Sequence, residues 1–165
     1  MTIDIYQQSE IKESIDRIDN ILSTDIFLQK SSIHPLCRSA FIEVLICLRD
    51  LMYKADKFSS RISFDDDVVK SQSNKINDIT DVIKYVRDAL CHLDSRNHYF
   101  ENSKMKATYN IAYGTSKLCN VGSNSQASDY EDDVCFFFGN QKIYLKRHIL
   151  RAFEEAKDKL MPLIR

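Results

Sequence analysis

The sequence predicts a single, mainly helical domain with four main helices and a small β-hairpin inserted before the last helix. The 165 residues are 44% hydrophobic and 28% charged, an ordinary globular composition that suffices for one hydrophobic core. Only 3 glycines and 2 prolines are present, and so few helix breakers favour long helices over a many-turned β-sandwich. Four segments repeat apolar residues at helical spacing, with polar stretches between them.

The first helix is expected over residues 8–23, and the second is expected to follow Ser31 and Ser32, with its apolar face over residues 36–58. In the first, apolar residues recur three or four positions apart, at Ile11, Ile15, Ile18 and Leu22. The second has a broad apolar face. Ser31 and Ser32 offer an N-cap for it, and Pro35 suits its first turn.

The third and last helices are expected over residues 76–93 and 146–163. The apolar seam of the third is Ile76, Ile79, Ile83, Val86, Leu90 and Leu93. The inward face of the last is Ile149, Leu150, Phe153, Ala156 and Leu160. A seam with this spacing is typical of antiparallel helix packing.

Residues 107–145 are expected to form the β insertion. Residues 107–113 alternate and carry tyrosines, which indicates a strand. A tight hairpin is predicted to join residues 135–138 to 141–145, because the Gly-Asn dipeptide between them is a good two-residue turn. The Ser-, Asn- and Asp-rich stretch 115–133 is expected to be a mobile loop.

Composition excludes several classes of function. The formal charge of -1 gives no global basic excess of the kind seen in general nucleic-acid binders. No apolar run is long enough for a membrane span, and the N-terminus lacks the pattern of a signal peptide. The five scattered cysteines form no Cys-x-x-Cys pair, so we expect no zinc, no cofactor and a reducing cytoplasmic location. Asp65, Asp66 and Asp67 are expected to cap a helix or stay solvated rather than bind a metal.

The strongest candidates for chemistry are Arg87, Asp88 and His92, near the end of the third helix. At about 100° per residue, His92 points roughly 150° and Arg87 about 70° from the apolar seam, so the trio faces away from the helix's own core. Asp88 precedes His92 by four residues, so the two side chains can touch. The alternative is a solvated helix end, where a cation only favours the helix dipole.

The segment Arg87 to His92, with a polar residue directly after the arginine, resembles the Arg-x4–6-His motif of the HEPN superfamily. The resemblance covers roughly residues 35–93 and the closing helix. It implies a four-helix HEPN-like bundle in which residues 107–145 are an insertion. In family members paired with nucleotidyltransferase antitoxins a tyrosine follows two residues after the histidine. Asp94 holds that place here, which argues against regulation by tyrosine modification.

The resemblance also implies a function. Many members of this family are dimeric, metal-independent endoribonucleases of toxin–antitoxin and phage-defence systems, with a composite site at the dimer interface. RNA would be cleaved through its own 2′-hydroxyl. His92 would act as general base or acid, Arg87 would hold the scissile phosphate, and Asp88 would orient the imidazole. Two alternatives are a non-catalytic HEPN-like module that binds a partner protein or a nucleotide, and an accessory subunit of a defence system.

A basic cluster at the start of the last helix is a second candidate site. It consists of Lys146, Arg147, His148 and Arg151. Cations are disfavoured at a helix N-terminus, and bound RNA phosphate would offset that cost. The alternative is pairing with the acidic run Glu131, Asp132 and Asp133. A further polar group, Arg96-Asn97-His98, is expected to be a loop surface.

Overall fold

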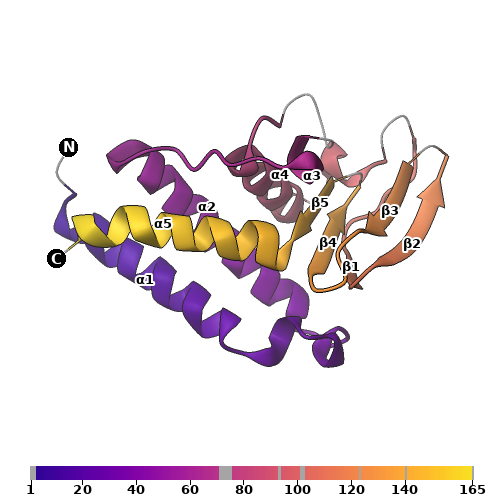
Figure 1. Ribbon diagram of the computed structural model, residues 1–165, viewed down its shortest axis with the longest axis horizontal. Helices are drawn as coiled ribbons and strands as arrows, with labels where there is room; N and C mark the ends of the chain where they lie inside the picture. The colour runs from indigo at the N-terminus through magenta and orange to yellow at the C-terminus, as the bar shows by residue number, and fades with distance from the viewer. Residues whose placement is uncertain are drawn as a thin grey trace. The chain divides into compact units, whose positions relative to one another are not determined.

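The computed structural model describes residues 3–70, 76–92, 94–100, 103–122, 124–139 and 141–164. Over these residues the chain is mostly helical, with an antiparallel sheet region before the last helix, as predicted (Figure 1). It divides into two compact units. We call Met1–Phe64 with Arg151–Arg165 the helical unit, and Asp65–Leu150 the mixed unit. A single domain over residues 1–165 stays a prediction.

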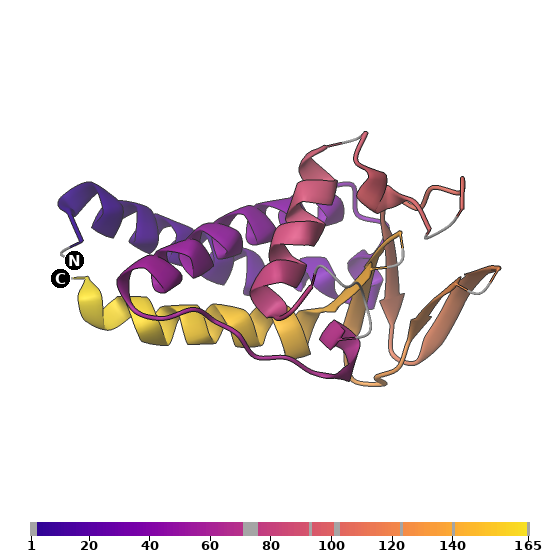
Figure 2. The ribbon, with the colours of Figure 1, turned by 90° about the horizontal axis from the view of Figure 1, so that it is seen from above.

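Three helices build the helical unit: α1 (Ile5–Leu22), α2 (Cys37–Phe58) and α5 (Arg151–Leu160). Short 3-10 turns follow α1 and α5, at Asp25–Phe27 (η1), Gln29–Ser31 (η2) and Met161–Leu163 (η5). Helix α2 packs against both α1 and α5, and the three lie side by side in both ribbon views (Figures 1 and 2). Fully buried side chains include Ile11, Ile18, Phe41, Leu45, Leu48 and Phe153.

The first helix is confirmed, but it begins before the predicted residue 8. Asp4 is the N-cap, and its carboxylate accepts from the backbone N–H of Gln7 at 2.8 Å. The Gln7 side chain accepts in return from the backbone N–H of Asp4 at 3.2 Å. This reciprocal pair is a capping box, and it extends the helix through residues that carry no apolar periodicity.

The predicted N-cap of α2 is wrong. Ser31 ends η2, and α2 begins only at Cys37, after Leu36, which makes no side-chain capping bond. Residues 25–31 fold into consecutive 3-10 turns, so Ser31 and Ser32 lie at the end of η2 and cannot cap α2. Thr24 is the side-chain cap in this region, and it accepts from the backbone N–H of Ile26 at 3.3 Å.

In the part of the mixed unit that the structure describes there are two α-helices, one 3-10 turn, a π-helix that precedes α5 and two small antiparallel sheets. The helices are α3 (Asp67–Lys70) and α4 (Ile79–Cys91), and the turn is η3 (Arg96–His98). The strands are β1 (Asn110–Tyr113), β2 (Ser116–Val121), β3 (Asn124–Ser128), β4 (Val134–Phe138) and β5 (Gln141–Tyr144). One sheet has the order β1-β4-β5, and the other pairs β2 with β3.

Helix α4 confirms the predicted seam. Its buried residues are Ile79, Val82, Ile83, Val86, Ala89 and Leu90. The helix is shorter than the predicted 76–93. Asp78 caps its start by accepting from the backbone N–H of Asp81 at 3.0 Å, and Cys91 is its last residue. Leu93 lies outside the described residues.

The predicted hairpin is confirmed. Strands β4 and β5 pair antiparallel, with Phe136 opposite Ile143 and Phe138 opposite Gln141. Gly139 begins the turn with a φ of 52°, a conformation that favours glycine; Asn140 lies outside the described residues. The strand expected over residues 107–113 is the shorter β1, which pairs with β4.

The expected mobile loop over residues 115–133 is wrong, because β2 and β3 form a second hairpin there. Its sequence lacks the apolar alternation that marks a half-buried strand. The buried side-chain amide of Gln126 ties this hairpin to the neighbouring strands instead. The side chain of Gln126 donates to the carbonyl of Gly139 at 2.9 Å and accepts from the amide of Asn110 at 2.7 Å.

The last predicted helix, residues 146–163, is not one regular α-helix. A π-helix, η4 (Leu145–Leu150), precedes α5, and η5 follows it. Asp133 organises the first turn, since its carboxylate accepts from the backbone N–H groups of Lys146 at 2.8 Å and Arg147 at 3.1 Å. Sequence periodicity could not reveal this, because the carboxylate arrives from the loop before β4.

Candidate functional site

Arg87 and Asp88 form an ion pair on the partly exposed side of α4. Nη1 of Arg87 lies 2.7 Å from Oδ1 of Asp88, and the two side chains are 32% and 37% exposed. Nε of Arg87 is buried and has no hydrogen-bond partner among the described residues. Because Nε is enclosed, an incoming oxyanion would have to meet the exposed part of the guanidinium.

His92 lies beyond the last helical residue. It is the C-cap of α4, its backbone is extended (φ -124°, ψ 98°), and its side chain is exposed. The helical projection that set His92 about 150° from the seam therefore does not apply to it. The side chain of Asp88 bonds Arg87, and no hydrogen bond joins Asp88 to His92 among the described residues. Its role as orienter of the imidazole stays a prediction.

The backbone of His92 is held by the turn that follows α4. Its carbonyl oxygen accepts from the backbone N–H of Ser95 at 2.9 Å and from Nε2 of His98 at 3.1 Å. His98 is fully buried, so the expectation of a loop surface for Arg96-Asn97-His98 is wrong at its last residue. The sequence carries no signal for this burial, because a histidine is as common on a loop surface as inside.

The basic residues of η4 are paired with carboxylates. Lys146 lies against Asp132, and Nη1 of Arg147 lies 3.1 Å from Asp132 and 3.2 Å from Asp133. The Arg147 guanidinium also stacks 3.8 Å from the ring of Tyr130. The structure thus shows the pairing alternative. The carboxylate of Asp133 already takes backbone N–H groups at this helix start, where a phosphate would bind.

His148 is fully buried and uses both ring nitrogens inside the mixed unit. Nδ1 accepts from the backbone N–H of Tyr144 at 3.1 Å, so Nε2 carries the proton that it donates to Asp66 at 2.9 Å. Burial lowers the pKa of His148 below its usual value, and the carboxylates of Asp66 and Asp133 oppose this only in part. The neutral, buried imidazole therefore has a structural role: its hydrogen bonds join the end of β5 to Asp66.

Asp66, one of the three adjacent carboxylates, accepts the hydrogen bond from Nε2 of His148. Its Oδ1 also accepts from the backbone N–H of Val69 at 2.8 Å, in the first turn of α3. Burial alone would raise the pKa of Asp66, but these hydrogen bonds outweigh it and lower that pKa. The expectation that the Asp run caps a helix is confirmed at this residue.

Arg151, the last member of the basic cluster, belongs to the helical unit. Its Nε lies 3.2 Å from Glu155, one turn further along α5, and its guanidinium stacks 3.8 Å from the ring of Phe64. The RNA-binding role predicted for Lys146, Arg147, His148 and Arg151 therefore stays a prediction. Lys146, Arg147 and Arg151 each lie beside a carboxylate. His148 is buried and cannot reach RNA.

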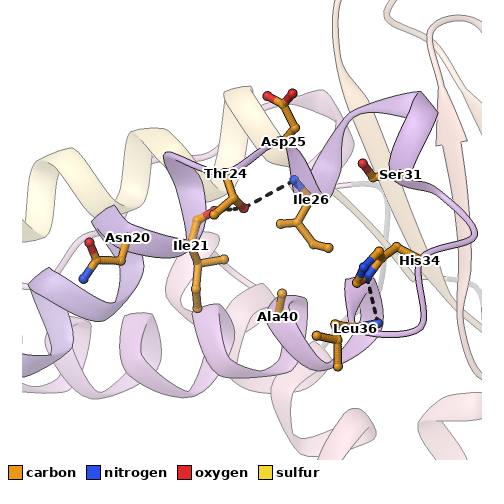
Figure 3. A pocket seen from close by; sticks show the side chains of 9 residues that line it. All are labelled: Asn20, Ile21, Thr24, Asp25, Ile26, Ser31, His34, Leu36 and Ala40. Atoms are coloured by element: carbon orange, nitrogen blue, oxygen red, sulfur yellow. Dashed lines mark hydrogen bonds between the residues drawn. The ribbon is translucent and has the colours of Figure 1, made fainter.

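A pocket of about 500 Å³ opens in the helical unit, between the end of α1, the 3-10 turns and the start of α2 (Figure 3). Its lining is mainly apolar. The lining residues are Asn20, Ile21, Thr24, Asp25, Ile26, Ser31, His34, Leu36 and Ala40. Two of its polar groups have local bonds: Thr24 caps η1, and Nδ1 of His34 accepts from the backbone N–H of Leu36 at 3.2 Å. Sequence reasoning missed this pocket, because irregular turns shape it.

Two absences hold for the described part of the chain. It contains no group of three or more His, Cys, Asp or Glu side chains placed to hold a metal ion. None of its helices has the length and apolarity that a membrane crossing requires.

Comparisons with protein-family models, with curated proteins and with solved structures find no match for this chain.

Proposed function

We propose that the protein is a HEPN-like, metal-independent endoribonuclease that acts as a homodimer in a toxin–antitoxin or phage-defence system. The observation that supports this most is the end of α4, where an arginine with a partly exposed guanidinium precedes an exposed histidine. In this proposal α1, α2, α4 and α5 are the helices of a HEPN-like bundle, and residues 107–145 are its insertion.

The proposed reaction is attack of an RNA 2′-oxygen on the adjacent phosphorus. His92 takes the 2′-hydroxyl proton as general base. The bond from phosphorus to the 5′-oxygen breaks, and that oxygen takes a proton from His92 of the second copy. The products are a 2′,3′-cyclic phosphate and a 5′-hydroxyl, so atoms and charges balance without a metal or a cofactor.

Arg87 is the proposed phosphate ligand. The exposed part of its planar guanidinium matches the non-bridging oxygens of the scissile phosphate. These donors stabilise the charge that builds up as phosphorus becomes five-coordinate. Asp88 holds one edge of the guanidinium through the 2.7 Å contact and so fixes which edge faces the RNA.

The first prediction is that His92→Ala and Arg87→Ala each abolish most RNA cleavage and leave the fold intact. Neither side chain is buried, so thermal unfolding should change little. General acid–base catalysis contributes about 10²–10⁴-fold, so the loss at His92 should be plain on a gel. EDTA should have no effect, and His34→Ala, the same change at another exposed histidine, should cleave normally.

Unchanged cleavage by His92→Ala, or loss of cleavage in EDTA, would contradict this mechanism. The candidate then favoured is a non-catalytic interaction module, or an accessory subunit whose active partner is another chain. The apolar pocket of the helical unit supports that candidate. Because no lysine or arginine lines it, the pocket favours an apolar group of a protein partner over the phosphates of a nucleotide.

A further inference from the structure

We infer that His98 is a positioning residue for His92, and that the β insertion is the frame that holds His98 in place. The inference rests on the proposed function for its catalytic meaning. It concerns a residue that touches His92 through the backbone and does not itself reach the substrate. All the residues involved belong to the mixed unit.

The first step is how His92 is held. Its side chain is exposed and makes no hydrogen bond among the described residues. Its backbone has left the helix, so the α-helical pattern no longer fixes the direction of its Cα–Cβ bond. What remains is the carbonyl oxygen, with two donors: the N–H of Ser95 and the ring of His98. These two bonds set the peptide plane and therefore the direction in which the imidazole leaves the chain.

The second step concerns the chemistry of His98. A carbonyl oxygen can only accept, so Nε2 of His98 carries the proton. The other nitrogen, Nδ1, is buried with no hydrogen-bond partner among the described residues. A fully buried ring with one orphan nitrogen costs more to bury than an apolar ring of the same size. Among the described residues, the bond to His92 is the one hydrogen bond that the ring makes, and it offsets part of the cost of burying a histidine at this position.

The third step is the frame around His98. Its carbonyl accepts from the backbone N–H of Ala107 at 2.8 Å, and the carbonyl of Ala107 accepts from the N–H of Gly139 at 2.8 Å. The carbonyl of Gly139 accepts in turn from the buried amide of Gln126 at 2.9 Å. One continuous chain of hydrogen bonds therefore runs from the β2–β3 hairpin, through the β4–β5 turn, to the end of α4.

The fourth step is the fit of the turn against η3. A Cβ on Gly139 would lie 2.7 Å from the carbonyl oxygens of both Asn97 and Tyr99, the residues on either side of His98. Backbone therefore packs directly on backbone around His98. The insertion does more than fill the gap before the last helix: it fixes the segment that directs His92.

Two near-isosteric variants test the inference. The side-chain amide nitrogen of glutamine falls near the place of Nε2, whereas that of asparagine falls near Nδ1 and does not reach His92. His98→Gln should keep kcat for RNA cleavage within about threefold of the wild type, and His98→Asn should lower it by about tenfold to a hundredfold. KM should stay within about twofold in both, because His98 does not bind RNA. Thermal unfolding should show both variants folded at the assay temperature, with His98→Asn the less stable because it loses the buried bond.

Two outcomes would overturn the inference. Wild-type kcat in His98→Asn would show that the bond does not matter for catalysis. Equal loss in both variants would show that His98 only supports the fold.

A second measurement separates this inference from the proposed function. Nitrogen-15 NMR of the wild type should show a protonated Nε2 on His98 with slow exchange, and His92 resonances that His98→Gln keeps and His98→Asn shifts. If the wild type cleaves no RNA but these shifts occur, the proposed ribonuclease fails and the positioning stands. If the His92 resonances are the same in all three proteins, the positioning fails.

Discussion

Gly139 shows how a single residue can be fixed by its neighbours' backbone. Its φ of 52° already disfavours a side chain. The nearest atoms to an added Cβ are the carbonyl oxygens of Asn97 and Tyr99 at 2.7 Å, and backbone cannot rotate away as a flexible side chain can. Gly122 has a similar φ of 61°, but an added Cβ would meet nothing within 4 Å. A substitution at Gly122 would therefore report conformational strain alone, and one at Gly139 would report strain and steric conflict together.

We predict that Gly139→Ala lowers the free energy of unfolding by about 2–4 kcal/mol, because strain and a backbone clash add. Gly122→Ala should cost about 1 kcal/mol, from its left-handed conformation alone. Urea unfolding of the two variants measures the difference. Equal losses would mean that the β4–β5 turn does not press on η3 as the structure shows.

His148 is a residue whose burial makes stability depend on pH. The folded protein holds it neutral, with its pKa lowered by burial, whereas the unfolded chain protonates it as the pH falls below about 6.5. The unfolded state then binds more protons than the folded one, and the linkage relation requires that stability fall with the pH. Protonation would also place a second N–H against the backbone N–H of Tyr144, which now donates to Nδ1.

We predict that the free energy of unfolding decreases as the pH is lowered from about 6.5 and stops decreasing below the folded pKa of His148. His148→Gln cannot titrate, so its curve should lack this slope, whatever its absolute stability. A further loss should begin below about pH 4, where the unfolded chain protonates Asp66 and the folded one, with its lowered pKa, does so later. Parallel curves for the wild type and His148→Gln between pH 7 and 5 would contradict the assignment.

At the scale of elements, two of the helices begin at aspartate caps with different surroundings. Asp4 is exposed at the start of α1, and Asp78 is buried at the start of α4. When an exposed cap is removed, water can satisfy the freed N–H. A buried N–H has no such replacement and bears the full desolvation penalty.

We therefore predict that Asp78→Ala lowers the free energy of unfolding by about 1.5–2 kcal/mol and Asp4→Ala by about 0.5–1 kcal/mol. Denaturant titration followed by circular dichroism measures both. Asp78 caps α4, the helix whose end holds Arg87 and His92. Asp78→Ala should therefore also lower RNA cleavage, and Asp4→Ala should not. A larger loss at Asp4 would show that burial does not decide the worth of these caps.

The elements that the sequence predicts are those whose cause is local. The α4 seam is visible because every third or fourth residue, such as Ile79, Ile83 and Val86, is buried on one face. The hairpin of β4 and β5 is visible because a Gly-Asn turn separates two short strands. The π-helix η4 is not visible, because Asp133 and Asp66 shape it from distant parts of the chain.

The candidate site divides in the same way. Arg87 and His92 are candidates from the motif alone, since their spacing along the chain is a local property, but the helical projection failed at His92, which lies past the end of α4. His98 and Gly139 are not: the bond from His98 to His92 depends on how the chain turns after α4, and Gly139 packs on residues about forty positions away. The β2–β3 hairpin is missed for a related reason: its stabilising group is the amide of Gln126, and polar residues carry no burial signal in a sequence.

At the scale of the whole molecule, the proposed chemistry requires two copies. We predict a homodimer in which the Arg87 to His92 segment of each copy lies near the two-fold axis, so that each phosphate meets both histidines. Light scattering at micromolar concentration should give twice the mass of one chain, and specific cleavage activity should fall on dilution below the dissociation constant. A monomer that cleaves RNA at constant specific activity would contradict the composite site.

The helical unit is built from two pieces of chain, residues 1–64 and 151–165, with the whole mixed unit between them. On the ribosome, α1 and α2 emerge long before α5, the helix that packs on α2. The mixed unit is contiguous, so its segments can meet as soon as residue 150 has left the exit tunnel. We expect the apolar surface of α2 that packs on α5 to stay exposed to solvent while the mixed unit is synthesised. We expect chaperones to bind this uncovered surface during that interval, because the helix that packs on it is made last.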